Sequence, residues 1–238
     1  MDEPKYHLAE IFDPTQADPC DAHSVLMRLV PPDSRVLELG CASGYLSDYM
    51  EQALGCHVTG IDADPVATAI AARRCSEVHT ADLDAPGALG PARASAPYDV
   101  LLAAAVLEHL KQPERLLCEA AALLKPGALA IASLPNIAHW SFRWRLLRGR
   151  FDYVDYGVMD RTHCRLYTVR TGRELLEGQG YRVERLMIAG SGLQNVAAAL
   201  ARRANRPEPR PILPGLLAYE LIYVARAPQD DPARAAEG

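Results

Sequence analysis

Short apolar runs alternate with amphipathic stretches over the first two thirds of the chain. The apolar runs predict strands over residues 35–40, 57–62, 77–81, 98–103 and 128–134. The stretches between them have helical spacing, and Asp64-Pro65 marks a helix start, because aspartate caps a helix and proline suits its first turn. Strands that alternate with helices are typical of a parallel sheet covered by helices.

The pattern changes towards the end of the chain. Residues 168–179 predict a helix, and residues 181–189 and 216–227 predict two late strands. No apolar crossover helix separates these strands, so we expect them to pair as an antiparallel edge of the parallel sheet. Before the first strand, Asp18-Pro19 predicts a helix that ends near Val30. The sequence thus predicts an α/β fold with seven strands.

One segment breaks the alternation. Residues 136–167 are rich in Trp, Phe, Tyr, Arg and Gly and are too long for an ordinary connection, so we expect a lid or acceptor-binding insertion before the sixth strand. Residues 1–227 then form one domain, with residues 1–33 as an N-terminal helical segment. Residues 228–238 offer no large apolar side chain to dock and predict a disordered tail.

Composition narrows the class of protein. The chain has 238 residues, 49% of them hydrophobic, and a formal net charge of -5. This charge gives no general reason to bind nucleic acid or an anionic membrane. The six cysteines show no C-x-x-C spacing, which indicates free thiols in a reducing compartment. The N-terminus lacks signal-peptide regions and no apolar run reaches bilayer length, so we expect a cytoplasmic protein.

A glycine-containing turn follows the first predicted strand. Residues 36–46 read Val-Leu-Glu-Leu-Gly-Cys-Ala-Ser-Gly-Tyr-Leu, with Gly40 and Gly44 between strand and helix. Glycine at such a turn lets a ligand approach the main chain closely. The dinucleotide fingerprint G-x-G-x-x-G fails, because Ala42 and Tyr45 occupy its glycine positions, and no Gly-Lys-Ser/Thr follows for a phosphate-binding loop.

Carboxylates follow the next strands in a regular order. Asp62 ends the second strand and can accept hydrogen bonds from two ribose hydroxyls. Asp82 and Leu83 follow the third strand, and Glu108-His109 follows the fourth. Together with E-x-G-x-x-x-G at Glu38, this series resembles class I S-adenosylmethionine-dependent methyltransferases.

The resemblance implies a Rossmann-like, doubly wound fold with a mostly parallel seven-stranded sheet and an antiparallel last strand. It also implies S-adenosylmethionine as methyl donor. The methionine part would lie near Glu38, Gly40 and Gly44, the ribose at Asp62, and the adenine at Asp82 and Leu83. The full predicted cofactor site comprises Glu38, Gly40, Cys41, Gly44, Asp62, Ala63, Asp82, Leu83 and Ala104.

The insertion carries a second resemblance. Residues 136–140, 149–153 and 160–168 are similar to a bacterial methyltransferase subgroup whose members occur alone or fused to glycosyltransferases. Methyl transfer to a hydroxyl benefits from a base with a pKa near neutrality, which favours histidine. We predict His163 as this base, with His139, Asp160 and His109 as further candidates. Each histidine has a structural alternative. His109 could begin a helix or pack in the core, His163 could anchor the insertion through hydrogen bonds, and His139 could pin the insertion to the sheet.

Two further features leave alternatives open. Arg143, Arg145, Arg148 and Arg150 either form a surface for an anionic substrate or are the solvated face of an amphipathic helix. Ubiquinone-pathway and RNA-terminal methyltransferases carry Glu-x-x-Glu-His as metal ligands, whereas this chain has Ala105 at the first position. The motif therefore lacks one oxygen ligand, and we expect no catalytic metal.

The predicted function is O-methylation of a small molecule such as a sugar, a polysaccharide precursor or a secondary metabolite. N-methylation of an amino sugar or amine is the enzymatic alternative. A non-catalytic methyltransferase-like partner protein is the alternative of a different class. We expect a small-molecule acceptor and neither nucleic acid nor membrane as partner, and the sequence leaves a homodimer open.

Overall fold

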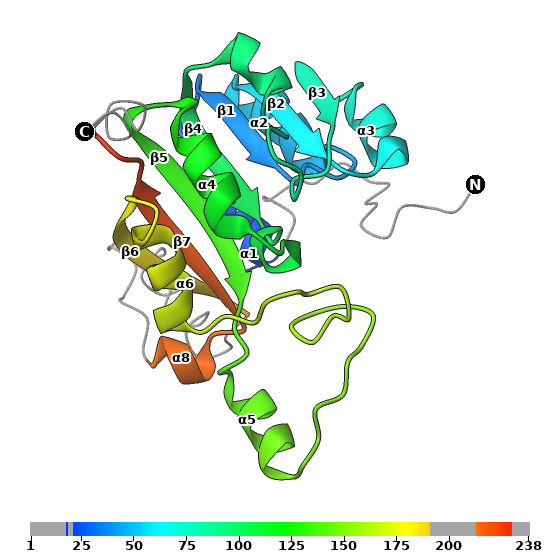
Figure 1. Cartoon of the computed structure of the whole chain (residues 1–238), viewed down its shortest axis with the longest axis vertical. Helices are drawn as coiled ribbons and strands as arrows, with labels where there is room; N and C mark the ends of the chain where they lie inside the picture. Colours follow the sequence, from blue (N-terminus) through cyan, green and yellow to red (C-terminus); the bar gives the residue numbers. More distant parts are fainter. Residues whose placement is uncertain (1–17, 19–20, 191–212, 230–238) are drawn as a thin grey trace.

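Seven strands form one mixed sheet in the order β3-β2-β1-β4-β5-β7-β6. The computed structural model describes residues 18, 21–190 and 213–229 (Figure 1). The strands are β1 (Arg35–Leu39), β2 (His57–Asp62), β3 (Glu77–Thr80), β4 (Tyr98–Ala104), β5 (Leu124–Pro135), β6 (Arg182–Ala189) and β7 (Glu220–Arg226). The first five run parallel, and β7 is antiparallel to both β5 and β6. The predicted α/β topology with an antiparallel last strand is confirmed.

The helices begin where local capping groups are available. They are α1 (Ala22–Met27), α2 (Tyr45–Leu54), α3 (Pro65–Ala71), η1 (Pro91–Ser95), η2 (Leu107–His109), α4 (Pro113–Ala121), α5 (Trp140–Leu147), α6 (Val169–Glu177) and α8 (Pro214–Leu217). Asp64 caps α3 as predicted, since its carboxylate accepts hydrogen bonds from the N–H groups of Val66 and Ala67. Thr168 and Thr171 form a capping box at the start of α6.

Some predicted boundaries differ from the structure. α1 is capped by Asp21, whose side chain accepts from the N–H groups of His23 and Ser24, rather than beginning at Asp18. The last strand begins at Glu220 instead of residue 216, because Pro214 starts the short helix α8. Conversely, β5 begins four residues before the predicted start, at Leu124. The predicted disordered tail, residues 228–238, lies outside the described residues except for its first two positions.

The core lies in two layers, one on each face of the sheet. Along β1, Leu37 and Leu39 point into the layer shared with α4 and α6, whereas Val36 points into the layer shared with α1 and α2. All three side chains are fully buried. Alternate residues of a strand face opposite sides of a sheet, so β1, which is covered on both faces, is apolar apart from Arg35 at its start and the buried Glu38.

The insertion leaves and rejoins the sheet at one point. Asn136 and Tyr167 pair through an isolated bridge, and the fully buried Asn136 side chain donates a 2.8 Å hydrogen bond to the carbonyl of Ala218. Between these ends, α5 and the long loop after it project away from the sheet (Figure 1). Among the described helices, none has the length and apolar character needed to cross a bilayer.

Candidate active site

A cavity of about 620 Å³ opens at the edge where the parallel strands end. Its wall includes residues that follow β1, β2, β3 and β4 and residues of the insertion. This volume falls within the range of small-molecule sites, roughly 300–1,000 Å³. The edge beyond the carboxyl ends of parallel strands is also where open α/β sheets bind ligands.

The turn after β1 forms one side of the cavity. Gly40 and Gly44 have φ angles of +71° and +74°, which side chains rarely adopt. A Cβ on Gly40 would lie 2.6 Å from Val106 Cγ2, and one on Gly44 would lie 3.0 Å from Ala71. Glycine at both positions therefore keeps this turn close to its neighbours.

Asp62 lies in the cavity wall at the end of β2. Its Oδ2 accepts a 2.8 Å hydrogen bond from the N–H of Ala42, and its Oδ1 accepts one of 2.9 Å from the N–H of Asp64. A carboxylate has about four lone-pair sites, so each oxygen retains acceptor capacity for a hydroxyl. The position and chemistry of Asp62 fit the predicted ribose contact.

Most of the predicted cofactor residues line this cavity, and three do not. Gly40, Asp62, Ala63, Asp82, Leu83 and Ala104 are in its wall. Cys41 and Gly44 belong to the turn but are not in the wall, since Cys41 lies against Gly60 and Gly44 lies against Ala71. Glu38 is buried and accepts a short hydrogen bond from the Ser47 hydroxyl, so it supports the turn from behind.

Burial makes Glu38 an unusually weak acid. Its pKa is raised to about 8, mainly because the buried carboxylate is desolvated and also because Cys75 and Asp62 lie nearby, while the hydrogen bond from Ser47 opposes the rise. The sequence suggested a contact with the methionine part of the cofactor. The structure instead gives Glu38 a supporting position beneath the turn.

The predicted catalytic residues separate into two groups. His109, Asp160 and His163 line the cavity, whereas His139 does not. Asp160 is buried, and its Oδ1 accepts hydrogen bonds from both the N–H and the hydroxyl of Thr162. The insertion thus supplies two of the three cavity-lining candidates, Asp160 and His163.

For His139, the structural alternative holds. It precedes α5, where its Nδ1 accepts from the N–H of Ser141 and lies 2.8 Å from the Ser141 hydroxyl. Its ring packs against Tyr219 with 5.5 Å between centroids, and burial lowers its pKa. His139 is therefore a capping residue that fixes the start of α5 against the sheet.

The arginines of the insertion also lie away from the cavity. α5 exposes Trp144, Leu146 and Leu147, and Arg148 stacks over the Trp144 ring at 4.3 Å. None of the four arginines between residues 143 and 150 is in the cavity wall. The structure therefore favours a solvated helix face over an anion-binding surface.

Sequence reasoning missed several residues of the wall. Glu220 on β7 lines the cavity, and burial raises its pKa. Tyr219, Tyr45 and His23 also line the cavity. The sequence feature that could have identified Glu220 as a site residue is a carboxylate at the start of an otherwise apolar strand. Only the pairing of β7 with β5, which sets Glu220 opposite Pro135, brings it to this edge.

The described wall is acidic. It contains Asp62, Asp64, Asp82, Asp84, Glu108, Asp160 and Glu220, and it includes neither Lys nor Arg. Such a surface attracts cationic groups and repels anions. A sulfonium with an ammonium group suits this wall, as does a neutral or cationic acceptor.

Comparison with known proteins identifies the family. Residues 15–186 match the family model described as "Methyltransferase domain". The chain belongs to this family. Its fold is that of class I methyltransferase domains, and the cavity lined by Asp62 and Asp82 has the polar groups expected of a site for S-adenosylmethionine. The family description names no metal.

The methyltransferase has curated relatives with a named activity. It is 36% identical over 109 residues to a ubiquinone biosynthesis O-methyltransferase of Maricaulis maris, covering 43% of this chain and 41% of that protein. It is 33% identical over 141 residues to a protein of the same name from Cereibacter sphaeroides, covering 54% and 56%. The chain thus matches about half the length of these relatives.

Solved structures share the fold of the methyltransferase. A methyltransferase of Haloferax volcanii, solved in complex with the Trm112 activator, superposes with a TM-score of 0.60 at 18% identity, covering 90% of each chain. Magnesium protoporphyrin IX methyltransferase of Synechocystis with bound SAH gives 0.55 at 17% identity, covering 85% and 77%. These identities support the fold alone.

Proposed function

We propose that this methyltransferase transfers a methyl group to a hydroxyl oxygen of a neutral small molecule. The observation that carries the proposal is the continuous cavity, which joins the cofactor residues Gly40 and Asp62 to the polar groups His109 and His163 of the acceptor end. The ubiquinone biosynthesis relatives, which are named O-methyltransferases, support the same chemistry. Sugars, polysaccharide precursors and secondary metabolites with a free hydroxyl are acceptors of this class.

The reaction needs alignment, exclusion of water and removal of a proton. When bound, S-adenosylmethionine supplies an electrophilic methyl group on a sulfonium. The acceptor oxygen would form its bond to the methyl carbon as the carbon–sulfur bond breaks, and the hydroxyl proton would pass to an imidazole nitrogen of His163 or His109. Gly157, Val158, Asp160 and His163 of the insertion line the cavity and would limit access of water to the acceptor. The cluster of Glu108, His109 and His163 is placed to receive or activate the acceptor hydroxyl.

The acidic wall also supports a second candidate function. An amine acceptor carries a positive charge before it loses its proton, and the ionised carboxylates of the cavity wall would attract it. N-methylation is therefore the alternative to O-methylation. An anionic acceptor such as a nucleotide sugar is disfavoured, because the cavity wall has neither Lys nor Arg among the described residues.

Two measurements test the proposal. Calorimetry with S-adenosylhomocysteine should show one saturable site per chain. Mass spectrometry of reactions with matched acceptor pairs, one bearing a hydroxyl and the other an amine on the same skeleton, should show a methylated hydroxyl product. A methylated amine alone would favour the alternative. Binding without transfer to any acceptor would favour a non-catalytic partner protein.

A further inference from the structure

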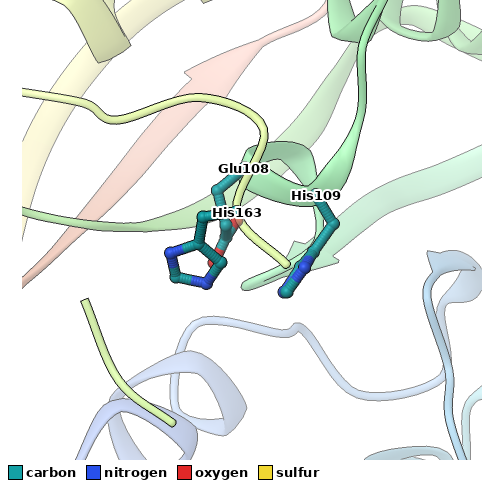
Figure 2. A group of neighbouring side chains, drawn as sticks. All are labelled: Glu108, His109 and His163. Carbon is teal, nitrogen blue, oxygen red and sulfur yellow. The ribbon is translucent and has the colours of Figure 1, made fainter. Parts of the chain in front are cut away.

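Three potential metal ligands converge at the acceptor end of the cavity. Glu108 and His109 belong to η2, directly after β4, and His163 comes from the insertion. Each offers one ligand atom, and these atoms all lie within 4.8 Å of one another. Figure 2 shows the three side chains gathered on one side of η2. The fold therefore assembles a carboxylate and two imidazoles from segments far apart in the sequence.

The main chain holds the two segments together. The Glu108 carbonyl accepts hydrogen bonds from the N–H groups of Cys164 and Arg165, at 2.8 and 3.1 Å. Arg165 adds an ion pair with Glu114 on α4 and donates to the carbonyl of Lys111. His163 is consequently fixed beside η2 by its neighbours in the chain, and its position next to Glu108 does not depend on its own side chain.

Hydrogen bonds orient both imidazole rings. His163 Nδ1 lies 3.1 Å from the carbonyl oxygen of Val158, which can only accept, so Nδ1 carries the proton. The Thr162 hydroxyl donates to Asp160 Oδ1 at 2.7 Å and therefore accepts from His109 Nδ1 at 3.1 Å. Both rings then have their lone pair on Nε2. Metal-binding histidines are held in this way by a second partner on the other nitrogen.

The Glu108 carboxylate supplies an independent indication of a ligand. The side chain is 1% exposed, and its Oε2 has no hydrogen-bond partner among the described residues. An unsatisfied carboxylate in the interior costs free energy, and buried charges are normally paired or bound to a metal. The described wall of the cavity contains no Lys or Arg that could pair with it.

We propose that Glu108, His109 and His163 bind one divalent transition-metal ion at the acceptor end of the cavity. Two imidazoles with one carboxylate suit zinc, manganese, cobalt or iron(II), whereas magnesium and calcium prefer oxygen ligands alone. At bonds of about 2.1 Å, ligands around a tetrahedral zinc ion lie roughly 3.4 Å apart. The three ligand atoms, which all lie within 4.8 Å of one another, would move closer together on binding the ion.

Three protein ligands leave coordination positions open towards the cavity. An acceptor hydroxyl bound there would be oriented towards the methyl donor and made more acidic, because a cation favours the deprotonated oxygen. This role rests on the proposed function, and it makes His163 a ligand in place of a base, since one lone pair cannot serve both. The proposed site also differs from the expectation of no metal. That expectation rested on Ala105 in the Glu-x-x-Glu-His motif and did not include His163, which is distant in the sequence.

Metal binding is measured on the full chain after dialysis against EDTA and removal of the chelator. Titration with Co²⁺ should show one ion per chain by calorimetry and a visible absorption band of the bound ion. Zn²⁺ should displace Co²⁺ and abolish the band. Magnesium at the same concentration should produce neither effect. S-adenosylhomocysteine is titrated in parallel, so that loss of the cofactor site and absence of the metal site are distinguished.

Variants assign the site to these residues. Glu108→Gln keeps the size of the side chain and removes its charge, and His163→Ala removes one imidazole; each should weaken Co²⁺ binding by roughly 100-fold or more. Thr162→Val removes the partner of His109 and should weaken binding by about 10–100-fold. His57→Ala, outside the described cavity wall, is the matched histidine control and should bind Co²⁺ like the unaltered chain.

The outcomes separate clearly. Stoichiometric binding lost in Glu108→Gln and retained in His57→Ala supports the site. S-adenosylhomocysteine binding without saturable Co²⁺ or Zn²⁺ binding overturns it and leaves the proposed function standing. Metal binding that is unchanged in both Glu108→Gln and His163→Ala also overturns it. If His163→Ala fails to fold by circular dichroism, Glu108→Gln alone decides.

Discussion

Asp62 Oδ2 accepts a 2.8 Å hydrogen bond from the N–H of Ala42, joining the end of β2 to the turn after β1. Ala42 has a φ of +47°, a conformation that costs energy for a residue with a side chain. The carboxylate compensates by holding the strained peptide in place. Asp62 consequently shapes the cofactor turn and faces the cofactor cavity with the same carboxylate.

Substitution of Asp62 should weaken cofactor binding. Asp62→Ala removes the acceptor for the ribose hydroxyls and leaves those hydroxyls without a hydrogen-bond partner, so we expect a loss of about 1–3 kcal/mol in S-adenosylhomocysteine affinity by calorimetry. Asp62→Asn retains one acceptor oxygen and should lose less. Asp99→Asn, outside the described cavity wall, is the control. Equal affinity in Asp62→Ala and the unaltered chain would refute the ribose contact.

Replacement of His163 should affect turnover more than cofactor binding. His163→Ala removes a group at the acceptor end, acting as base or as metal ligand, and should lower kcat by about 10²–10⁴-fold. The dissociation constant of S-adenosylhomocysteine should stay nearly unchanged, because the cofactor residues lie elsewhere in the wall. Steady-state kinetics and calorimetry measure both. A near-normal kcat would remove His163 from the reaction.

Removal of divalent metal should lower turnover. After EDTA treatment and dialysis, kcat should fall, and Zn²⁺, Mn²⁺ or Co²⁺ should restore it in the unaltered chain but not in Glu108→Gln. Magnesium serves as the negative control, since the site has only one oxygen ligand among its three. A rate that survives chelation would instead support the expectation that Ala105 leaves the chain independent of metal.

Glu38→Gln should stabilise the protein at high pH. The folded-state pKa of Glu38, about 8, lies above its ordinary value of 4.5. The folded protein therefore holds the proton more tightly, and the stability that this provides is complete below pH 4.5 and is lost as the pH rises towards 8. Glutamine has no proton to lose. The variant should gain about 1–3 kcal/mol in unfolding free energy relative to the unaltered chain between about pH 5 and about pH 8.

Urea unfolding at about pH 5 and about pH 8 measures the difference in unfolding free energy between Glu38→Gln and the unaltered chain. Glu51→Gln, a half-buried carboxylate on the same helix that supports Glu38, is a suitable control for charge removal. A gain for Glu38→Gln that is equal at the two pH values would show that the carboxyl group has an ordinary pKa. The comparison between variants cancels the contribution of Glu108, whose pKa is also raised to about 8 by burial.

Local sequence determined most of the strands, the start of α3 and the turn after β1. β2 runs over the predicted residues, and Asp64 with Pro65 starts α3, because capping and φ restriction act within a few residues. Gly40 and Gly44 were recognisable for a similar reason, since a tight turn between strand and helix needs residues that tolerate positive φ. The order of the carboxylates then placed Asp62 and Asp82 at one edge of the sheet.

The directions of individual side chains could not be predicted from local sequence patterns. The motif assigned Glu38 to the cofactor, but alternation along β1 and contact with α2 turn its carboxylate towards Ser47. His139 looked as suitable as His163 by residue type, and only the start of α5 decides that His139 caps a helix. These outcomes depend on packing between elements, which local patterns do not encode.

Only the tertiary structure decided which residues distant in the sequence lie next to one another. The chain sequence shows Glu108-His109 as an incomplete metal motif after Ala105, and His163 as an isolated residue of the insertion. Hydrogen bonds from Cys164 and Arg165 to the Glu108 carbonyl bring His163 to the pair. The pairing of β7 with β5 likewise delivers Glu220 to the cavity. Sequence determined which chemical groups were present, whereas strand order and the return of the insertion to η2 determined which of them meet.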